Sequence, residues 1–240
     1  AFGGKGRFTK KILQLDNLLQ KNKQSPFRDD AEFEMGMTYL VQDKEREALK
    51  RFQNVYRDYP SSSYVKRAYL KAGLIHYNLN ENQKALSMLK NVAENYPNTS
   101  EANEALSSIK SIYMDMNSVE DYFEYANNLD YAKVSASEQD SATYISAENQ
   151  YMDGDCKKST KEFSKYLDLY PNGSFTTNAH FYRGQCHYRN KNFDKALDDY
   201  EYVLDQPQSE FTETSLVKAS SILYDNGNYR KALDYFRQLT

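Results

Sequence analysis

The alternation of apolar and polar positions along the chain predicts pairs of helices. Within residues 61–97, Ala68, Ala72 and Ile75 recur at intervals of three and four, the spacing of one helical face. A polar stretch, residues 78–82, interrupts this pattern as a short turn. Apolar residues at similar spacing then form a second face: Ala85, Leu86, Leu89, Val92 and Ala93. The segment is therefore expected to fold as two helices joined by a tight turn.

Proline marks the ends of these helix pairs. Tyr-Pro occurs at residues 59–60, 96–97 and 170–171, and Pro207 follows. The prolines are 37, 74 and 36 residues apart, so they keep a step of about 37 residues. Proline cannot continue a helix and disfavours the helical conformation in the residue before it. The chain is therefore expected to repeat one unit of two helices.

Three further columns of residues keep the same step. Small residues stand at Gly36, Gly73, Ala147 and Gly184. Alanines stand at Ala48, Ala85, Ala196 and, one residue early, Ala232. Large side chains stand at Phe52, Leu89, Phe163, Tyr200 and Phe236. We expect the small residues where the two helices of a unit cross, because a larger side chain would force the helix axes apart.

The period and these columns resemble the tetratricopeptide repeat, a helix pair of about 34 residues. In residues 61–97 the resemblance rests on Tyr69, Gly73, Ala85 and Leu89 and on the closing Pro97. It implies an all-α, right-handed α-α superhelix of about six helix pairs plus one leading helix. It also implies a non-enzymatic scaffold for protein–protein interaction.

The residues at the ends and turns of the repeats resemble those of a narrower branch of that family. The Tyr-Pro-x-Ser motif and the segment at residues 227–233 are similar to sequences of bacterial cell-envelope members. Those members include outer-membrane assembly lipoproteins and Tol–Pal-associated periplasmic proteins. The resemblance implies a periplasmic or outer-membrane-associated protein, and it leaves a cytoplasmic location open.

The repeats divide the chain into three predicted segments. Residues 1–24 are expected to be the second helix of a preceding, truncated repeat, and both ends are expected to be cut from a longer array. Residues 25–134 and 135–240 are expected to be half-arrays of three repeats each. In the third repeat, Lys110 and Tyr122 replace the small residues, and no Tyr-Pro closes it. The array is expected to kink there, with a degenerate repeat packed in register as the alternative.

Composition narrows the classes of function. Only 40% of the 240 residues are apolar and the mean hydropathy is −0.87, yet there are 22 tyrosines and 12 phenylalanines. This combination fits a thin stack of helices lined with aromatic rings better than one deep core. A net charge of −3 argues against nucleic acid as a partner. No apolar run approaches the roughly 20 residues of a membrane span.

The sequence offers no constellation for catalysis. His76 and His187 occupy the repeat column of Tyr39, so we interpret them as substitutes for a packing tyrosine. There is no phosphate-binding glycine loop, nucleophile elbow or zinc-ligand spacing. We therefore expect no enzyme activity, no cofactor and no metal site.

The two cysteines leave two states open. Cys156 and Cys186 lie 15 residues before and after Pro171, so they should stand at the same height on consecutive antiparallel helices. A disulfide requires Cα atoms within about 7 Å, and facing positions on helices packed about 8–10 Å apart can meet that distance. A disulfide and two packed thiols are both consistent with the sequence.

The resemblance also implies a binding site. In tetratricopeptide arrays the first helices line a concave groove that binds peptides. Carried over column by column, the groove positions and their polar neighbours are Phe33, Leu40, Arg67, Leu70, Tyr77, Tyr144, Glu148, Tyr151, Phe181, Gln185, Tyr188, Arg189 and Tyr224. We expect a partner protein to place an extended peptide or a helix there, in a cell-envelope assembly. Recognition of a glycan or peptidoglycan by the same tyrosines is the alternative, and packing of these rings between repeats is a third interpretation.

Overall fold

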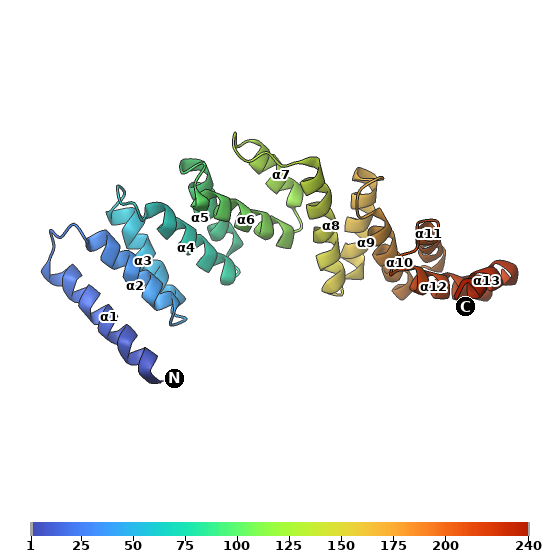
Figure 1. Cartoon of the computed structure of the whole chain (residues 1–240), viewed down its shortest axis with the longest axis horizontal. Helices are drawn as coiled ribbons and strands as arrows, with labels where there is room; N and C mark the ends of the chain where they lie inside the picture. Colours follow the sequence, from blue (N-terminus) through green and yellow to red (C-terminus); the bar gives the residue numbers. More distant parts are fainter. Residues whose placement is uncertain (1, 240) are drawn as a thin grey trace. The chain divides into compact units, whose positions relative to one another are not determined.

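The computed structural model describes the backbone of residues 2–239 and the side chains of residues 6–239. Within this range the chain forms thirteen α-helices, a final 3₁₀ turn and no strand (Figure 1). The all-α prediction and the expected number of helices are confirmed. Consecutive helices lie side by side from the first to the fifth and again from the seventh to the thirteenth.

The chain divides into two compact units. The first extends to Tyr113 and includes Asn128–Ala132, and the second contains Met114–Asn127 and the described residues from Lys133 onward. The first unit holds α1 (Phe2–Lys21), α2 (Arg28–Leu40), α3 (Glu45–Asp58), α4 (Val65–Asn78), α5 (Asn82–Asn95) and most of α6 (Ser100–Asp115). The second holds α7 (Val119–Asn127), α8 (Ala136–Met152), α9 (Cys156–Leu169), α10 (Thr176–Arg189), α11 (Phe193–Leu204), α12 (Thr212–Asp225) and α13 (Tyr229–Phe236). The predicted kink and the predicted segment boundaries stay predictions.

The small residues allow the two helices of a pair to approach closely. A Cβ added to Gly36 would lie 2.6 Å from Phe52 Cε1, and one added to Gly73 would lie 2.7 Å from Leu89 Cγ. Phe52 and Leu89 are fully buried, so neither can move aside without disturbing the core. Even alanine is too large at these crossings.

The turns inside the pairs share a backbone conformation. Each contains a residue with positive φ, and these residues keep the step of 37 until the last one: Asp43, Asn80, Asn117, Gly154, Lys191 and Gly227. Aspartate, asparagine and glycine tolerate this left-handed conformation better than other residues. Asn117 shows that the third repeat keeps the turn although it loses the small residues.

Aromatic stacking joins three of the helix pairs to the pair that follows. The residue immediately before α4, α10 or α12 is aromatic, and its ring stacks on the first helix of the preceding pair. The ring centroids are 4.8 Å apart for Phe33–Tyr64, 4.6 Å for Tyr144–Phe175 and 4.5 Å for Phe181–Phe211. At these three junctions the core lies between pairs, so the pairs that meet there depend on each other.

A buried polar joint fixes the turn between α9 and α10. The Tyr166 hydroxyl donates a hydrogen bond to Asp140 Oδ1 at 2.5 Å and accepts one from the backbone N–H of Phe175 at 3.1 Å. The second carboxylate oxygen of Asp140 accepts from the backbone N–H of Ser174 at 2.8 Å. Tyr166 is fully buried and Asp140 is nearly so. The hydrogen bonds of this satisfied network therefore stabilise the fold.

We expect Tyr166→Phe to destabilise the second unit by about 1–3 kcal/mol, because it removes both bonds of the hydroxyl and leaves Asp140 short of a donor. Tyr200→Phe is the matched control. Tyr200 is equally buried, but its hydroxyl has no hydrogen-bond partner among the described residues. Its loss should be neutral or slightly stabilising. Urea denaturation followed by circular dichroism measures both, and equal effects of the two substitutions would contradict this account of the joint.

Candidate functional site

The second unit presents three tyrosines at equivalent positions near the ends of its first helices. Each is the next-to-last residue of its helix: Tyr151 in α8, Tyr188 in α10 and Tyr224 in α12. We call these three residues the tyrosine row. Tyr151 and Tyr188 are half-buried, and Tyr224 is 59% exposed. The row is therefore partly open to solvent, as an interaction surface requires.

Cations lie over the first two tyrosines. The Arg189 guanidinium is 4.9 Å from the centroid of the Tyr151 ring, and Nη2 donates a hydrogen bond to the Tyr151 hydroxyl at 2.9 Å. Lys218 Nζ is 4.2 Å from the centroid of the Tyr188 ring. Each cation comes from the first helix of the following pair. The cation–π contacts therefore join the first helices of the three pairs into one surface.

Four predicted groove residues lie in the core instead. Phe33, Leu70, Tyr144 and Phe181 are at most 9% exposed, which corrects their assignment as partner-contacting positions. The reason is their place in the middle of a first helix. Phe33, for example, packs against Phe52 of its own pair and against Tyr64 at the start of the next. A ring that fills the junction of two pairs cannot contact a partner in the folded chain.

The other predicted residues lie at the surface or near it. Leu40, Tyr77 and Gln185 are half-buried on α2, α4 and α10, and Arg67 is exposed with its guanidinium 4.7 Å from the Phe33 ring. Glu148 accepts a hydrogen bond from the Tyr144 hydroxyl at 2.6 Å. Burial, and after it this bond, raises the pKa of Tyr144, so the tyrosine stays the donor. Glu148 therefore accepts a hydrogen bond from a core residue while it remains half-buried near the surface.

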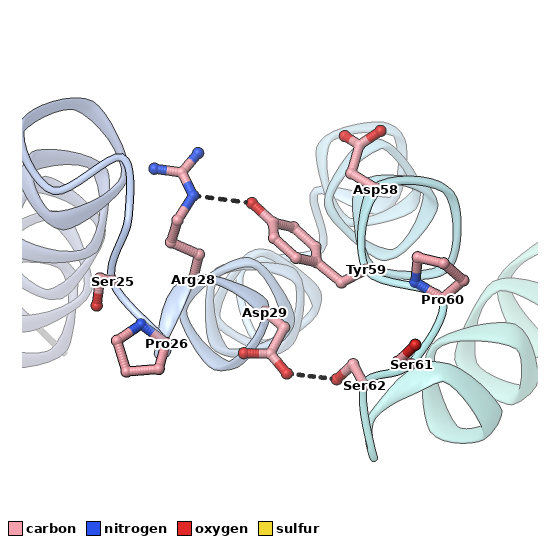
Figure 2. Close-up of a pocket in the computed structure, with 9 residues that line it drawn as sticks. All are labelled: Ser25, Pro26, Arg28, Asp29, Asp58, Tyr59, Pro60, Ser61 and Ser62. Atoms are coloured by element: carbon pink, nitrogen blue, oxygen red, sulfur yellow. Dashed lines mark hydrogen bonds between the residues drawn. The ribbon is translucent and has the colours of Figure 1, made fainter.

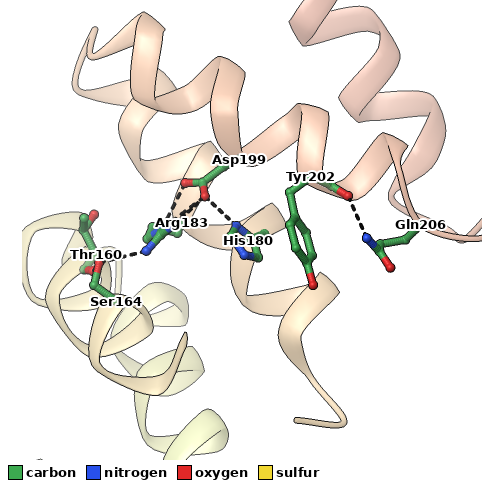
Figure 3. A network of polar contacts seen from close by, with 7 residues as sticks. All are labelled: Thr160, Ser164, His180, Arg183, Asp199, Tyr202 and Gln206. Carbon is green, nitrogen blue, oxygen red and sulfur yellow. Dashed lines mark hydrogen bonds and ion pairs between the residues drawn. The ribbon is translucent and has the colours of Figure 1, made fainter. Parts of the chain in front are cut away.

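A polar network that the sequence did not predict joins α9, α10 and α11 (Figure 3). Asp199 is 2% exposed and accepts hydrogen bonds from Arg183 through both oxygens, at 2.7 to 3.2 Å. His180 Nδ1 lies 2.7 Å from the same carboxylate, and Arg183 also donates to Ser164. The buried carboxylate is thus compensated by Arg183 and His180, and the network ties three helices together.

His187 borders a cavity of about 270 Å³ beside this network. Burial lowers the pKa of its imidazole, although Asp199 acts in the opposite direction. The unfolded chain therefore takes up the proton first, so this contribution to stability is present above about pH 6.5 and is lost as the pH falls.

We expect the wild-type second unit to lose more stability on acidification than a His187→Gln variant, whose side chain does not titrate. Urea midpoints measured at several pH values for both proteins provide the test. Parallel pH profiles would refute the assignment to His187, whereas a steeper decline for the wild type supports it.

A polar depression of about 400 Å³ lies at the turns around α2, α3 and α4 (Figure 2). The Arg28 guanidinium donates to the Tyr59 hydroxyl at 3.1 Å and to the Leu19 carbonyl at 2.6 Å. Ser62 donates to Asp29 at 2.5 Å. Because these side chains are bonded to one another across successive turns, we interpret the depression as a joint between repeats.

An apolar hollow of about 510 Å³ lies on the last helix pair. It is lined by Tyr224, Tyr229, Ala232, Leu233 and Phe236. One repeat earlier, Ala196 and Tyr200 are fully buried in a cluster with Phe211, Ala219 and Ile222. The hollow is therefore the kind of surface on which a further helix of a repeat array packs.

Cys156 and Cys186 form a disulfide, with their Cα atoms 5.1 Å apart. It links the start of α9 to the end of α10, and so connects two successive pairs. Among the described residues, no group of three or more histidine, cysteine or acidic side chains is arranged to hold a metal ion. None of the helices described here combines the length and apolarity needed to cross a lipid bilayer.

Comparison with known proteins supports the repeat family. Tetratricopeptide-repeat models match residues 30–62, 67–99 and 177–206, which cover most of α2–α3, α4–α5 and α10–α11. No curated protein matches the sequence. The fold is that of a tetratricopeptide-repeat solenoid, and three of its helix pairs are recognised as repeats of that family. Proteins of this family commonly mediate protein–protein interactions, and the fold is generally a non-enzymatic scaffold.

Two solved structures align with this chain at low sequence identity. The structure of Naa15/Naa10 bound to HypK-THB aligns with a TM-score of 0.58 at 13% identity, over 96% of this chain and 34% of that chain. A tetratricopeptide repeat protein from Parabacteroides merdae aligns with a TM-score of 0.47 at 16% identity, over 99% of this chain and 88% of that one. At these identities the likeness concerns the fold alone.

Proposed function

We propose that the chain is an interaction scaffold that binds a peptide segment of a partner protein on the tyrosine row. The observation that carries the proposal is the pairing of half-buried tyrosines with cations on one surface, Tyr151 with Arg189 and Tyr188 with Lys218. Tyrosine and arginine are the residues that most often dominate binding at protein interfaces. Their attachment to helices limits the conformational entropy lost when a partner binds.

The surroundings of the rings favour a peptide over a glycan. A sugar stacks on the open face of an aromatic ring. Tyr151 instead lies close to both Arg189 and Tyr182, whose ring centroid is 4.7 Å away. Tyr188 is covered by Lys218 and meets Phe193 edge-on at 5.4 Å. A peptide can use the edges and hydroxyls of these rings together with the cations.

The proposed setting is a bacterial cell-envelope assembly. The Cys156–Cys186 disulfide supports it, because disulfides form and persist in oxidising compartments such as the periplasm. Trapping of free thiols with an alkylating reagent in intact cells, followed by mass measurement, tests the setting. Two alkylated cysteines would contradict an oxidising compartment.

Selection from a displayed library of random peptides tests the binding function. We expect enrichment of peptides on the wild-type protein that a Tyr151→Ala plus Tyr188→Ala variant does not retain. The control variant is Tyr56→Ala plus Tyr69→Ala, which removes two half-buried tyrosines that stack on each other in the first unit. Circular dichroism and thermal unfolding establish that the variants fold. Enrichment that is absent, or equal on the row variant, would contradict the proposal.

A further inference from the structure

We infer that the Cys156–Cys186 disulfide positions the tyrosine row, so that oxidation of these cysteines brings the peptide site to its tight-binding state. This inference rests on the proposed function and names a condition that regulates the same site. The disulfide lies next to the row on both sides of the junction. Cys156 begins α9 five residues after Tyr151, and Cys186 precedes Tyr188 by two residues on α10.

The residue five positions after each row tyrosine is the first residue of the second helix of its pair. In the two later pairs this residue is aromatic and meets the row tyrosine edge-on. The ring centroids are 5.4 Å apart for Tyr188–Phe193 and 5.2 Å for Tyr224–Tyr229. In the first pair of the row the same position is Cys156, which carries no ring. Tyr151 therefore lacks this support from the second helix of its own pair.

Support for Tyr151 comes from α10 of the next pair. Its ring centroid is 4.7 Å from that of Tyr182, and the Arg189 guanidinium lies 4.9 Å from the same centroid and donates to the hydroxyl at 2.9 Å. Tyr151 therefore keeps its position only while the ends of α8 and α10 keep theirs. The disulfide is the covalent link between the two pairs at this end of the helices.

A tightly bonded turn connects Cys156 to Tyr151. The backbone N–H of Gly154 donates to the Tyr151 carbonyl, and that of Cys156 donates to the Gly154 carbonyl, both at 3.0 Å. Asp155 caps α9 by accepting a hydrogen bond from the backbone N–H of Lys158 at 3.0 Å. Because the turn is fixed in this way to the start of α9, a bond that holds Cys156 against α10 also holds Tyr151 there.

In the reduced chain this end of the junction depends on non-covalent contacts alone. Arg189 is exposed, so water competes for its contact with Tyr151. Cys186 is fully buried, so its free thiol cannot turn into solvent, and the two thiols must find room inside a closely packed junction. The reduced row therefore samples more arrangements, and a peptide that binds it must restrict them at a cost in affinity.

The bond forms by thiol–disulfide exchange with a disulfide donor. Cys156 is half-buried and Cys186 is fully buried, so the Cys156 thiolate is the one that reaches the donor. It attacks one donor sulfur and releases the first donor thiol. The Cys186 thiolate then attacks Cys156 Sγ and releases the second. Two electrons pass from the cysteines to the donor, whose two released sulfurs take up the protons, and a dithiol reductant reverses the sequence.

Fluorescence anisotropy with a labelled peptide, selected by display on the oxidised protein, tests the inference. We expect reduction with dithiothreitol to weaken binding to the wild type about fivefold, as when binding must order one additional side chain. Re-oxidation with oxidised glutathione should restore the affinity. Circular dichroism establishes that the reduced protein is folded at the temperature of the measurement. Hydrogen exchange should show protection lost at the ends of α8 and α10 and retained in α12.

Cys156→Ala plus Cys186→Ala is the control for the reductant, and it should bind as weakly as the reduced wild type whether or not dithiothreitol is present. If this variant does not fold, the cycle of reduction and re-oxidation of the wild type decides alone. Equal affinities of the oxidised and reduced wild type, or complete unfolding of the reduced protein, would overturn the inference and leave peptide binding standing. If no peptide binds the oxidised protein, the proposed function fails and the inference fails with it.

Discussion

Gly73→Leu should unfold the first unit or leave it severely destabilised, by more than about 3 kcal/mol. Even a single Cβ at this position would lie 2.7 Å from Leu89 Cγ and 3.4 Å from Met88 Cβ. Leu89 of α5 is fully buried, so the crossing of α4 and α5 cannot widen without opening the core. Because stability in a repeat array depends on contacts between neighbours, the damage should spread through the first unit.

Hydrogen exchange read by mass spectrometry measures this effect along the chain. We expect protection to be lost in α2–α5 and retained in α8–α13. Gly6→Leu is the control, because it makes the same change on α1 at a position where an added Cβ meets nothing within 4 Å. Full protection of α4 and α5 in Gly73→Leu would show that the helices do not cross where the small residues indicate.

The repeat architecture could be predicted because its determinants are local and recur. A glycine or alanine at four of the crossings and a proline after four of the pairs act within one unit, so the step of about 37 residues exposes them. The left-handed turn residues, from Asp43 to Gly227, keep the same step. They were not predicted, because aspartate, asparagine, glycine and one lysine all occur at this position of the repeat. A search for Asn, Asp and Gly together would have found most of it.

The stacking between pairs was harder to predict. Tyr64, Phe175 and Phe211 stand just before first helices. The spacing of apolar residues along a helical face therefore does not include them. The Arg183–Asp199 pair is harder still, because an arginine at the position of Arg183 occurs in one repeat only. An ion pair confined to a single repeat leaves no periodic signal, and its two members are recognisable only when the helices are placed together.

The residues of the candidate site could be predicted only in part, for a physical reason. Phe181 and Tyr188 are seven residues apart, so they lie on the same stripe of α10. The periodicity therefore gives both the same face. Only the packing shows that Phe181 is covered by Phe211 while Tyr188 remains half-exposed. The pairing of Lys218 with Tyr188 was also missed, because the cation comes from another repeat at an irregular spacing.

Cys156→Ala plus Cys186→Ala should lower the free energy of unfolding of the second unit by about 3.7 kcal/mol, the chain-entropy value for closing a loop of this size. The cysteines are 30 residues apart and join α9 to α10, so the bond restricts the unfolded chain across a junction between pairs. Alanine is the suitable replacement because Cys186 is fully buried, and serine would bury an unpaired hydroxyl there. Guanidinium denaturation followed by circular dichroism gives the difference. Reduced wild-type protein should unfold close to the variant, and reductant should leave the variant unchanged. If oxidised wild type and variant unfold at the same midpoint, the disulfide does not stabilise the junction.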